Sequence, residues 1–340
     1  MALTLHGTVS DNTVALDRKT ATPLIINGDM QIAQRATSGT YTGTENEVET
    51  CDRWKGFIGS AGTFTNTQDT DVPSGYGFVK SWKLDCTTAD ASLSSTDFFH
   101  LTHNFEGQDC QVFKKGTANA EKLTVAFWVK SHVTGTFTCE LVDFDNSRGC
   151  SKSYTVSSAN TWEKKVISFP ADTSDPLDND NNKSFAVRFW LAAGSGFSSG
   201  TLQQTWADLV TANQVASGQV NLASSTDNNW WLTGVQLEVG EFDANSIPDF
   251  QFEDVATSLA RCQRYFYKFN DIIRGNGADD VNNCHIGNMC YPSEMRADPT
   301  LSVTTSATFI SDRGDKQVFC VYADTGYATV SAGATADAEL

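Results

Sequence analysis

Apolar and polar residues alternate along several short segments of the chain, which is the pattern of β-strands with one face in a core. The clearest segments are 123–130, 184–193 and 231–240, and clusters rich in Gly, Ser, Asn and Asp separate the strand-like segments. Their predicted inward positions are Leu123, Val125, Phe127 and Val129; Phe185, Val187, Phe189 and Leu191; and Trp231, Val235, Leu237 and Val239. Many short strands without intervening helices predict a mostly β protein, built as an antiparallel β-sandwich.

Helical periodicity appears only after Pro248. Apolar residues of segment 252–269 recur at alternating three- and four-residue steps, and acidic residues lie near its start, where the helix dipole favours negative charge. The stripe consists of Phe252, Val255, Leu259, Cys262, Phe266 and Phe269. Fewer than three heptads do not define a coiled coil, so the stripe fits either a helix packed on its own domain or an oligomer interface. These six residues are the oligomer-interface candidates.

The patterns divide the chain into an N-terminal arm over residues 1–22, a sandwich over 23–245, and a helix followed by a small β domain over 246–340. Apolar residues alternate with polar ones in the arm, at Leu3, Leu5, Val14 and Leu16. An alternating segment too short to fold alone is expected to pair with another chain or with the sandwich. We therefore expect the arm to serve in attachment or in strand exchange between subunits.

The formal net charge of −17 over 340 residues narrows the range of partners. Nucleic acids and anionic membranes attract clusters of Lys and Arg, and no basic stripe interrupts the acidic sequence, so neither is expected. No apolar run approaches membrane-spanning length, and the first residues lack the pattern of a secretory signal. The nine scattered cysteines are expected to be free thiols, often buried, made in a reducing cytoplasm; a few disulfides formed after release are the alternative.

No motif for catalysis or metal binding stands out. The sequence lacks a phosphate-binding glycine loop, a nucleophile elbow and a zinc-protease helix, and 41 acidic residues do not single out a catalytic pair. Two groups come closest to metal sites: Cys284, His285 and Cys290, and Asp178, Asp180 and Asn182. The first has a spacing unlike structural zinc sites, and the second lacks the glycine and the distal Glu of a calcium loop. Buried thiols and a solvated turn are therefore preferred, and no enzyme is expected.

The tryptophans are more informative about binding than the acidic residues and the metal-like groups. In the predicted strands, Trp128 and Trp190 point away from the core. An exposed tryptophan is uncommon, so a loop, a neighbouring subunit or a stacked sugar ring is expected to cover each of them. Trp206 and Trp230 are expected on the loop side, whereas Trp231 is predicted to lie in the core. Trp128, Trp190, Trp206 and Trp230 are the glycan-binding candidates.

Six segments occur in an order that resembles one group of proteins. They are PLIINGDMQIAQR (23–35), CDRWKGF (51–57), LTVAFWVKS (123–131), TWEKKVISFPAD (161–172), TGVQLEVG (233–240) and ARCQRYF (260–266). The series resembles phage tail-fibre and related virion structural proteins that carry a jelly-roll module similar to carbohydrate-binding modules. The resemblance implies that the sandwich is a jelly roll.

The resemblance further implies a non-enzymatic virion protein, a tail fibre or similar appendage, which is made in the host cytoplasm and forms a homotrimer. Its implied partners are other virion proteins, contacted through the arm, and host-surface polysaccharide during adsorption. Two alternatives remain open: a head fibre that decorates the capsid, and a glycan-binding module without a major role in assembly. A polysaccharide-degrading tailspike would need β-helix repeats or a defined carboxylate pair, and neither is evident.

Related binding modules often hold a structural calcium ion where their first and last strands meet. The resemblance implies Asp29 and Glu238 as the candidate ligands for such an ion in this chain. The sequence GDM followed by Gln31 departs from the acidic pattern that is usual at this site. The structure must therefore show whether oxygen ligands gather there.

Overall fold

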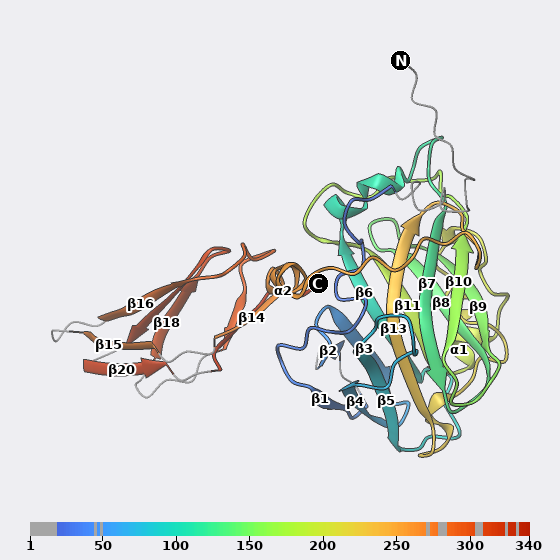
Figure 1. The fold of residues 1–340 in the computed structure, drawn as a ribbon, viewed down its shortest axis with the longest axis horizontal. Coiled ribbons are helices and arrows are strands. Elements are labelled where there is room, and N and C mark those ends of the chain that lie inside the picture. Colours follow the sequence, from blue (N-terminus) through green and yellow to red (C-terminus); the bar gives the residue numbers. More distant parts are fainter. Residues whose placement is uncertain are drawn as a thin grey trace.

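The computed structural model describes residues 19–43, 46–47, 50–269, 273–277, 284–302, 309–323, 326–330 and 333–340. Residues 1–18, which include all the alternating apolar positions of the arm, lie outside the described residues. The pairing of the arm therefore stays a prediction. Figure 1 shows a large β-sandwich and, beside it, a smaller group of C-terminal strands.

Two antiparallel sheets form the sandwich, which confirms the predicted mostly β fold. The six-stranded sheet has the order β1 (Ser38–Tyr41), β4 (Thr63–Asp69), β5 (Ser81–Thr88), β13 (Asn229–Val239), β7 (Leu123–Ser131) and β10 (Glu163–Phe169). The seven-stranded sheet has the order β12 (Ala207–Asp208), β9 (Arg148–Val156), β8 (Gly135–Asp143), β11 (Lys183–Ala193), β6 (Phe98–Glu106), β3 (Trp54–Gly59) and β2 (Asn46–Glu47). From β5 to β8 consecutive strands cross from one sheet to the other, as in a jelly roll.

Within the described residues, helices are few and the C-terminal strands form three small sheets. The helices are η2 (Gly107–Phe113), α1 (Ser195–Ser198), η3 (Thr211–Asn213), η4 (Leu222–Ser224) and α2 (Val255–Gln263). The small sheets are β14 (Phe266–Lys268), β21 (Thr335–Asp337) and β17 (Thr300–Ser302); β15 (Ile273–Gly277) and β20 (Gly326–Val330); and β16 (Cys284–Cys290), β19 (Val318–Ala323) and β18 (Phe309–Gly314). Among the helices of the described residues, none has the length and apolar character needed to span a membrane.

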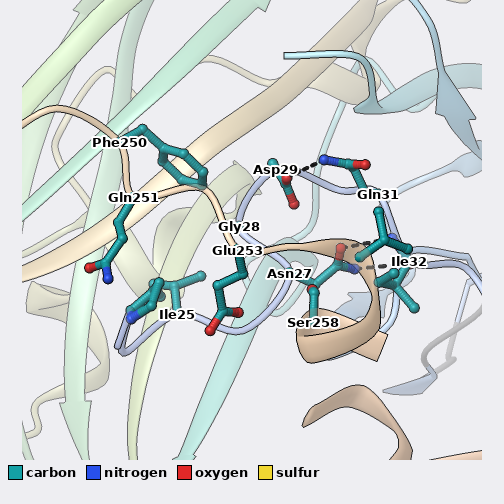
Figure 2. A pocket seen from close by; sticks show the side chains of 12 residues that line it. Ile25, Asn27, Gly28, Asp29, Gln31, Ile32, Phe250, Gln251, Glu253 and Ser258 are labelled. Atoms are coloured by element: carbon teal, nitrogen blue, oxygen red, sulfur yellow. Dashed lines mark hydrogen bonds between the residues drawn. The ribbon is translucent and has the colours of Figure 1, made fainter. Parts of the chain in front are cut away.

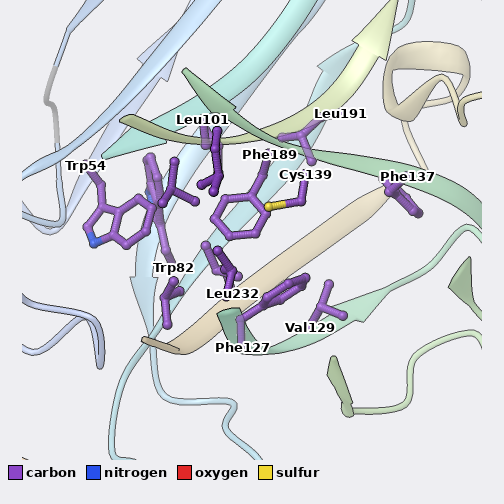
Figure 3. Close-up of a cluster of buried hydrophobic side chains, with 14 of the residues drawn as sticks. Trp54, Trp82, Leu101, Phe127, Val129, Phe137, Cys139, Phe189, Leu191 and Leu232 are labelled. Atoms are coloured by element: carbon purple, nitrogen blue, oxygen red, sulfur yellow. The ribbon is translucent and has the colours of Figure 1, made fainter. Parts of the chain in front are cut away.

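The apolar faces of the two sheets meet in one core (Figure 3). The side chains there include Trp54, Trp82, Leu101, Phe127, Val129, Phe137, Cys139, Phe189, Leu191 and Leu232. Phe127 in β7 and Phe189 in β11 meet edge to face with ring centroids 4.8 Å apart, so they join the two sheets directly. Every inward position predicted for segments 123–130 and 184–193 is buried.

Strand β13 contains an irregularity that the alternation missed. Its pairing with β7 shifts register between Thr233 and Gln236, and Gly234 in this β-bulge has a φ of +61°. The bulge moves the inward face of the strand by one position. Trp230 is therefore fully buried in the core, whereas Trp231 lies on the outer face under Lys130. The predicted places of these two tryptophans were wrong because alternation was carried through the bulge.

Helix α2 is shorter than the helix predicted over 252–269. It starts near the expected point, because the Asp254 side chain accepts a hydrogen bond from the backbone N–H of Thr257 at 3.0 Å. It ends early because the residues that follow form β14, which pairs with β21 from the end of the chain. Phe266 and Phe269 therefore do not belong to the helix, and the predicted continuous stripe was wrong.

A buried arginine holds the C-terminal strands against the sandwich. The guanidinium of Arg53, next to β3, pairs with Glu339 and lies 3.4 Å over the ring of Tyr265. It also donates a hydrogen bond to the carbonyl of Asn104 at 2.7 Å. Tyr265 precedes β14 and Glu339 follows β21, so one cation holds the segments that flank the two paired strands.

Glu106, at the end of β6, forms a second anchor. Its carboxylate accepts hydrogen bonds from Arg264 Nε at 2.9 Å, from Arg264 Nη2 at 2.7 Å and from the Tyr265 hydroxyl at 2.6 Å. Burial alone would raise the pKa of Glu106, but the hydrogen bonds outweigh it and hold that pKa below its usual value. The ionised form of Glu106 is thus part of the folded contact.

Seven cysteines are free thiols in the structure, as predicted. Cys51, Cys86, Cys110, Cys139, Cys150 and Cys262 are buried, and Cys290 is exposed. The side chains of Cys284 and Cys320 lie outside the described residues. Buried free cysteines behave as small apolar side chains, and in this chain most of them add to the sandwich core.

Candidate functional site

The loop between β4 and β5 folds across the outer face of the six-stranded sheet. Gly234, in the bulge of β13, leaves room for it, because a Cβ there would lie 2.5 Å from Phe78 and 3.1 Å from Trp128. The neighbouring Thr233 donates its hydroxyl to the carbonyl of Lys80 at 2.8 Å, which fixes the end of the loop on the same strand. The bulge therefore positions the loop.

This loop builds an exposed aromatic surface. Tyr76 is 56% exposed and lies against Trp128, with ring centroids 4.3 Å apart. Phe78 contacts Phe250 and Phe252, on the linker before α2, with centroids 5.1 and 5.2 Å away. These five residues are called the aromatic surface below. Contiguous exposed apolar groups of this kind mark sites of interaction.

Exposed apolar side chains concentrate at this place. In the part of the chain that the structure describes, the large exposed ones are Tyr76, Val79, Val210, Phe252 and Val255. Val79 belongs to the same loop as Tyr76, and Val255 opens α2 three residues after Phe252. All but Val210 therefore lie on or next to the aromatic surface, so we expect a ligand or a partner to cover it.

A row of charged and aromatic side chains lies on the same face of the sheet. Lys130 in β7, Trp231 in β13 and Lys83 in β5 are direct neighbours across three adjacent strands. The Nζ atom of Lys130 lies 4.0 Å from the centre of the Trp231 ring, and that of Lys83 lies 5.4 Å from it. Cation–π attraction of this kind stabilises the position of the indole ring.

Asp71 and Trp162 extend this row. Trp162, just before β10, donates its Nε1–H to Asp71 at 2.9 Å, and Lys130 pairs with the same carboxylate. Burial would raise the pKa of Asp71, but the hydrogen bonds from Lys130 and Trp162 bring it below its usual value. Trp231 donates to Asp69 at 3.1 Å. The face thus combines aromatic rings with fixed donors and acceptors, which suits a ligand with apolar faces and hydroxyl groups.

The four predicted glycan-binding tryptophans lie in different environments. Trp128 reaches this face and is half-buried. Trp190 points away from its own sheet as expected, but α1 covers it and it is 2% exposed. Trp230 is in the core, and Trp206 is half-buried, donating its Nε1–H to the carbonyl of Pro170 at 2.8 Å. A binding role for any of them stays a prediction, and Trp128 has the surroundings that suit it best.

The six oligomer-interface candidates are also separated. Phe252 and Val255 are exposed beside the loop that carries Tyr76. The other four pack against the sandwich or the C-terminal strands: Leu259, Cys262, Phe266 and Phe269. A contact between subunits at Phe252 and Val255 stays a prediction.

Asp29 lies at the seam between the N-terminal segment and the linker before α2 (Figure 2). The cavity there has a volume of about 10 Å³, which leaves room for about one water molecule. Burial raises the pKa of Asp29, and its carboxylate accepts a hydrogen bond from Gln31 Nε2 at 2.6 Å. Glu238 does not line this cavity. Across the described residues, no three His, Cys, Asp or Glu side chains are grouped to hold a metal ion.

The structure tests one of the two metal-like groups found in the sequence. Asp180 closes a turn, because its carboxylate accepts hydrogen bonds from the backbone N–H of Asn182 at 2.9 Å and from the side-chain amide of Asn182 at 2.5 Å. This is the solvated turn that the sequence favoured. The side chains of Cys284 and His285 lie outside the described residues, so their prediction is not tested.

Sequence reasoning missed three side chains of this face. Tyr76 lies in a glycine-rich turn, SGYGF, where no periodicity exists to read, and Trp162 precedes its strand. Trp231 was assigned to the core. One signal was available: a glycine inside a strand pattern, here Gly234, often marks a bulge.

No family model matches the sequence, and no curated protein matches it. Similar solved structures include the enzymatically active domain of tailspike protein 4 of bacteriophage CBA120, at 13% identity over 64% of this chain and 21% of that chain, with a TM-score of 0.32. They also include the family 11 carbohydrate-binding module of the cellulosomal cellulase Lic26A-Cel5E of Clostridium thermocellum, at 12% identity over 66% and 98% of the two chains, with a TM-score of 0.28. A third is TmCBM61 in complex with β-1,4-galactotriose, at 9% identity over 64% and 98%, with a TM-score of 0.30. The match spans about a fifth of the tailspike chain, and likenesses this low assign no ligand or activity to this protein.

Proposed function

We propose that this protein is a non-enzymatic structural protein of a virion appendage, a tail fibre or similar structure, which forms a homotrimer and binds host-surface glycans during adsorption. The ordered series of six sequence segments supports the appendage. A net charge of −17 suits a repetitive assembly that has to stay in solution. The alternative to a tail appendage is a head fibre that decorates the capsid.

The contact between the exposed Tyr76 and the half-buried Trp128 is the observation that carries the glycan proposal. A pyranose ring presents an apolar face of C–H groups and a rim of hydroxyl groups. Tyr and Trp rings offer a large apolar contact at low entropic cost. The Lys130 and Asp71 side chains lie on the same sheet face, and charged groups make the stronger hydrogen bonds to hydroxyls. A saccharide lying on the rings could therefore be held by both kinds of contact.

Removing either ring of this pair is expected to weaken glycan binding. Tyr76→Ala and Trp128→Ala should each lower the affinity by about tenfold or more, because a lost ring contact is worth roughly 1–2 kcal/mol. Tyr76→Phe keeps the ring and should bind nearly as tightly as the wild type. A glycan array identifies the bound saccharide, and isothermal titration calorimetry with that saccharide measures the affinities.

Val210→Ser is the matched control, since Val210 is an exposed apolar side chain away from the aromatic surface. It should leave glycan affinity unchanged. Wild-type affinity in both Tyr76→Ala and Trp128→Ala would contradict a binding site on this face. An array without any bound saccharide would remove the glycan part of the proposal.

The exposure of Phe252 and Val255 supports a separate role in assembly. Both side chains are large and apolar, yet they are about half exposed, at 45% and 57%. If they lie between subunits of the proposed trimer, Phe252→Ser combined with Val255→Ser should convert it to monomer. Light scattering on the full-length chain measures the mass directly.

Point substitutions are a better test than truncation before α2. Truncation would also remove Tyr265 and Glu339, and so leave the buried Arg53 without its partners. Val79→Ser is the control, because Val79 is exposed on the loop and not on the linker. A trimer in the double variant would move the subunit contacts elsewhere, and a monomeric wild-type chain would refute the homotrimer.

A further inference from the structure

A polar row crosses the outer face of the seven-stranded sheet, on the opposite side of the sandwich from the aromatic surface. Lys55 in β3, Thr102 in β6, Arg188 in β11 and Glu140 in β8 are direct neighbours across four adjacent strands. Thr102 and Glu140 are fully buried, at 2% and 0% exposure. Each loses its hydration on burial, and hydrogen bonds offset this loss: Thr102 donates to Asn104, and Glu140 accepts from Trp190.

Cations gather along this row. Lys183, in the same strand as Arg188, places its Nζ atom 4.0 Å from the centre of the Phe144 ring, and the guanidinium carbon of Arg188 lies 5.3 Å from the same centre. Burial lowers the pKa of Lys183, and the positive charges of Arg188 and Lys55 lower it further. Burial also lowers the pKa of Lys55. We call Lys55, Lys183 and Arg188 the cation cluster.

Few carboxylates of the described residues face the cluster, and those near Lys55 are shared with other cations: Glu339 pairs with Arg53, and Asp337 with Arg35. The Glu140 carboxylate lies 3.5 Å from Arg188 Nη1 and also accepts a hydrogen bond from Trp190. The Nε atom of Arg188 is buried without a hydrogen-bond partner. His100, 6% exposed and on the same face, likewise has an unpartnered Nδ1 atom. The Glu140 Oε1 atom is unpartnered too, so it is the Arg188 donor, next to like charges, that favours an external anion.

We propose that the cation cluster binds a carboxylate-bearing saccharide, such as a chain of uronic acid residues. The three positive charges would pair with the carboxylate, and the guanidinium of Arg188 can donate two parallel hydrogen bonds to it. The aromatic side chain of Phe57, stacked on His100 with centroids 5.2 Å apart, supplies apolar contact beside the cluster. This inference rests on the proposed glycan function and adds to it a second site, on the opposite sheet face, with its own ligand class.

The overall charge of −17 does not oppose such a ligand. At physiological ionic strength, charges more than about 8 Å apart on a protein surface are largely screened. The groups nearest to the bound carboxylate therefore decide the interaction. The three cations outnumber the Glu140 carboxylate, and the two other carboxylates that act on Lys55, those of Glu339 and Asp337, pair with Arg53 and Arg35. A neutral saccharide accepts hydrogen bonds through its hydroxyl oxygens but leaves the positive charge of the cluster uncompensated.

The experiment is isothermal titration calorimetry of the full-length chain with tetragalacturonate and with its fully methyl-esterified form. The two probes share one backbone and differ in charge, so tighter binding of the acid by about tenfold or more is expected. Lys183→Met and Arg188→Gln should remove this preference, and Lys183→Arg should retain it. Lys122→Met is the matched control, because it removes an exposed lysine that pairs with Glu241 outside both sheet faces.

Equal binding of acid and ester, or binding of the ester alone, would overturn the inference and leave the proposed glycan function standing. Absence of binding for both probes would overturn it as well, and the glycan array then decides the proposed function separately.

Sodium sulfate is titrated as a third probe. If sulfate binds as tightly as tetragalacturonate, the cluster takes a simple anion and the assignment to a saccharide is refuted. Unchanged acid preference in both Lys183→Met and Arg188→Gln would place the site elsewhere.

Discussion

Arg53→Met is expected to lower the free energy of unfolding by about 3–5 kcal/mol, the usual cost of breaking a buried ion pair from one side. The Arg53 side chain is 1% exposed and that of Glu339 is 6% exposed, so water cannot replace the lost partner. The substitution also removes the cation over the Tyr265 ring and the hydrogen bond to the Asn104 carbonyl. Urea unfolding at neutral pH measures the change.

The contacts of Arg53 predict which part of the structure the substitution destabilises first. Because Tyr265 and Glu339 flank the β14–β21 pair, the C-terminal strands should separate from the sandwich before the sandwich itself unfolds. Hydrogen exchange should therefore rise in β14 and β21 of the variant, while β7 and β13 in the core stay protected. Limited proteolysis should cut the linker between β13 and α2 faster than in the wild type.

A double-mutant cycle separates the ion pair from the packing of the side chain. Glu339→Gln alone leaves Arg53 charged and buried, and the double variant removes both charges, so it should be more stable than the sum of the single losses predicts. Lys122→Met is the surface control and should cost under about 1 kcal/mol, as exposed pairs do. A loss in Arg53→Met as small as that of the control would show that the C-terminal strands do not depend on this contact.

Local periodicity was sufficient to predict the sandwich. The alternation in segments 123–130 and 184–193 reports which residues face the core, and all of them are buried. Alternation also placed Trp128 and Trp190 on outer faces, but it contains no information about what covers a face. Trp190 is covered by α1, which lies within the long connection after β11, and no pattern in the strand itself signals this.

The errors arise where a distant segment or a special backbone conformation overrides the local pattern. The apolar spacing of 252–269 is helical throughout, yet β14 forms because a strand from the chain end pairs with it. Trp230 and Trp231 exchange places because Gly234 has a positive φ in a bulge. Tyr76 lies in a turn whose position depends on that same bulge, so the candidate site required the tertiary structure.

Gly234→Val is expected to disable glycan binding at the aromatic surface although Gly234 itself is not exposed to ligand. A β-branched residue is strained at a φ of +61°, and its Cβ would lie 2.5 Å from Phe78 and 3.1 Å from Trp128. The strain and the overlap together should cost about 3 kcal/mol or more. Relief requires the Phe78 ring to move, and with it we expect the loop that carries Tyr76 to move away from the sheet.

Gly218→Val is the matched control for this substitution. Gly218 has a φ of +81°, but an added Cβ would meet no atom within 4 Å, so the variant has the backbone strain without the overlap. It should lose about 1–2 kcal/mol of stability and keep wild-type glycan affinity. Thermal unfolding and calorimetry with the saccharide from the array compare the two variants.

A second substitution tests the cause of the effect. Phe78→Ala in the Gly234→Val background removes the ring that the valine would overlap, so part of the lost stability should return. Glycan affinity should recover less, because Phe78 also supports the loop through Phe250 and Phe252. If Gly234→Val and Gly218→Val behave alike in both measurements, the bulge of β13 does not position the loop. The aromatic surface would then be held by its own ring contacts alone.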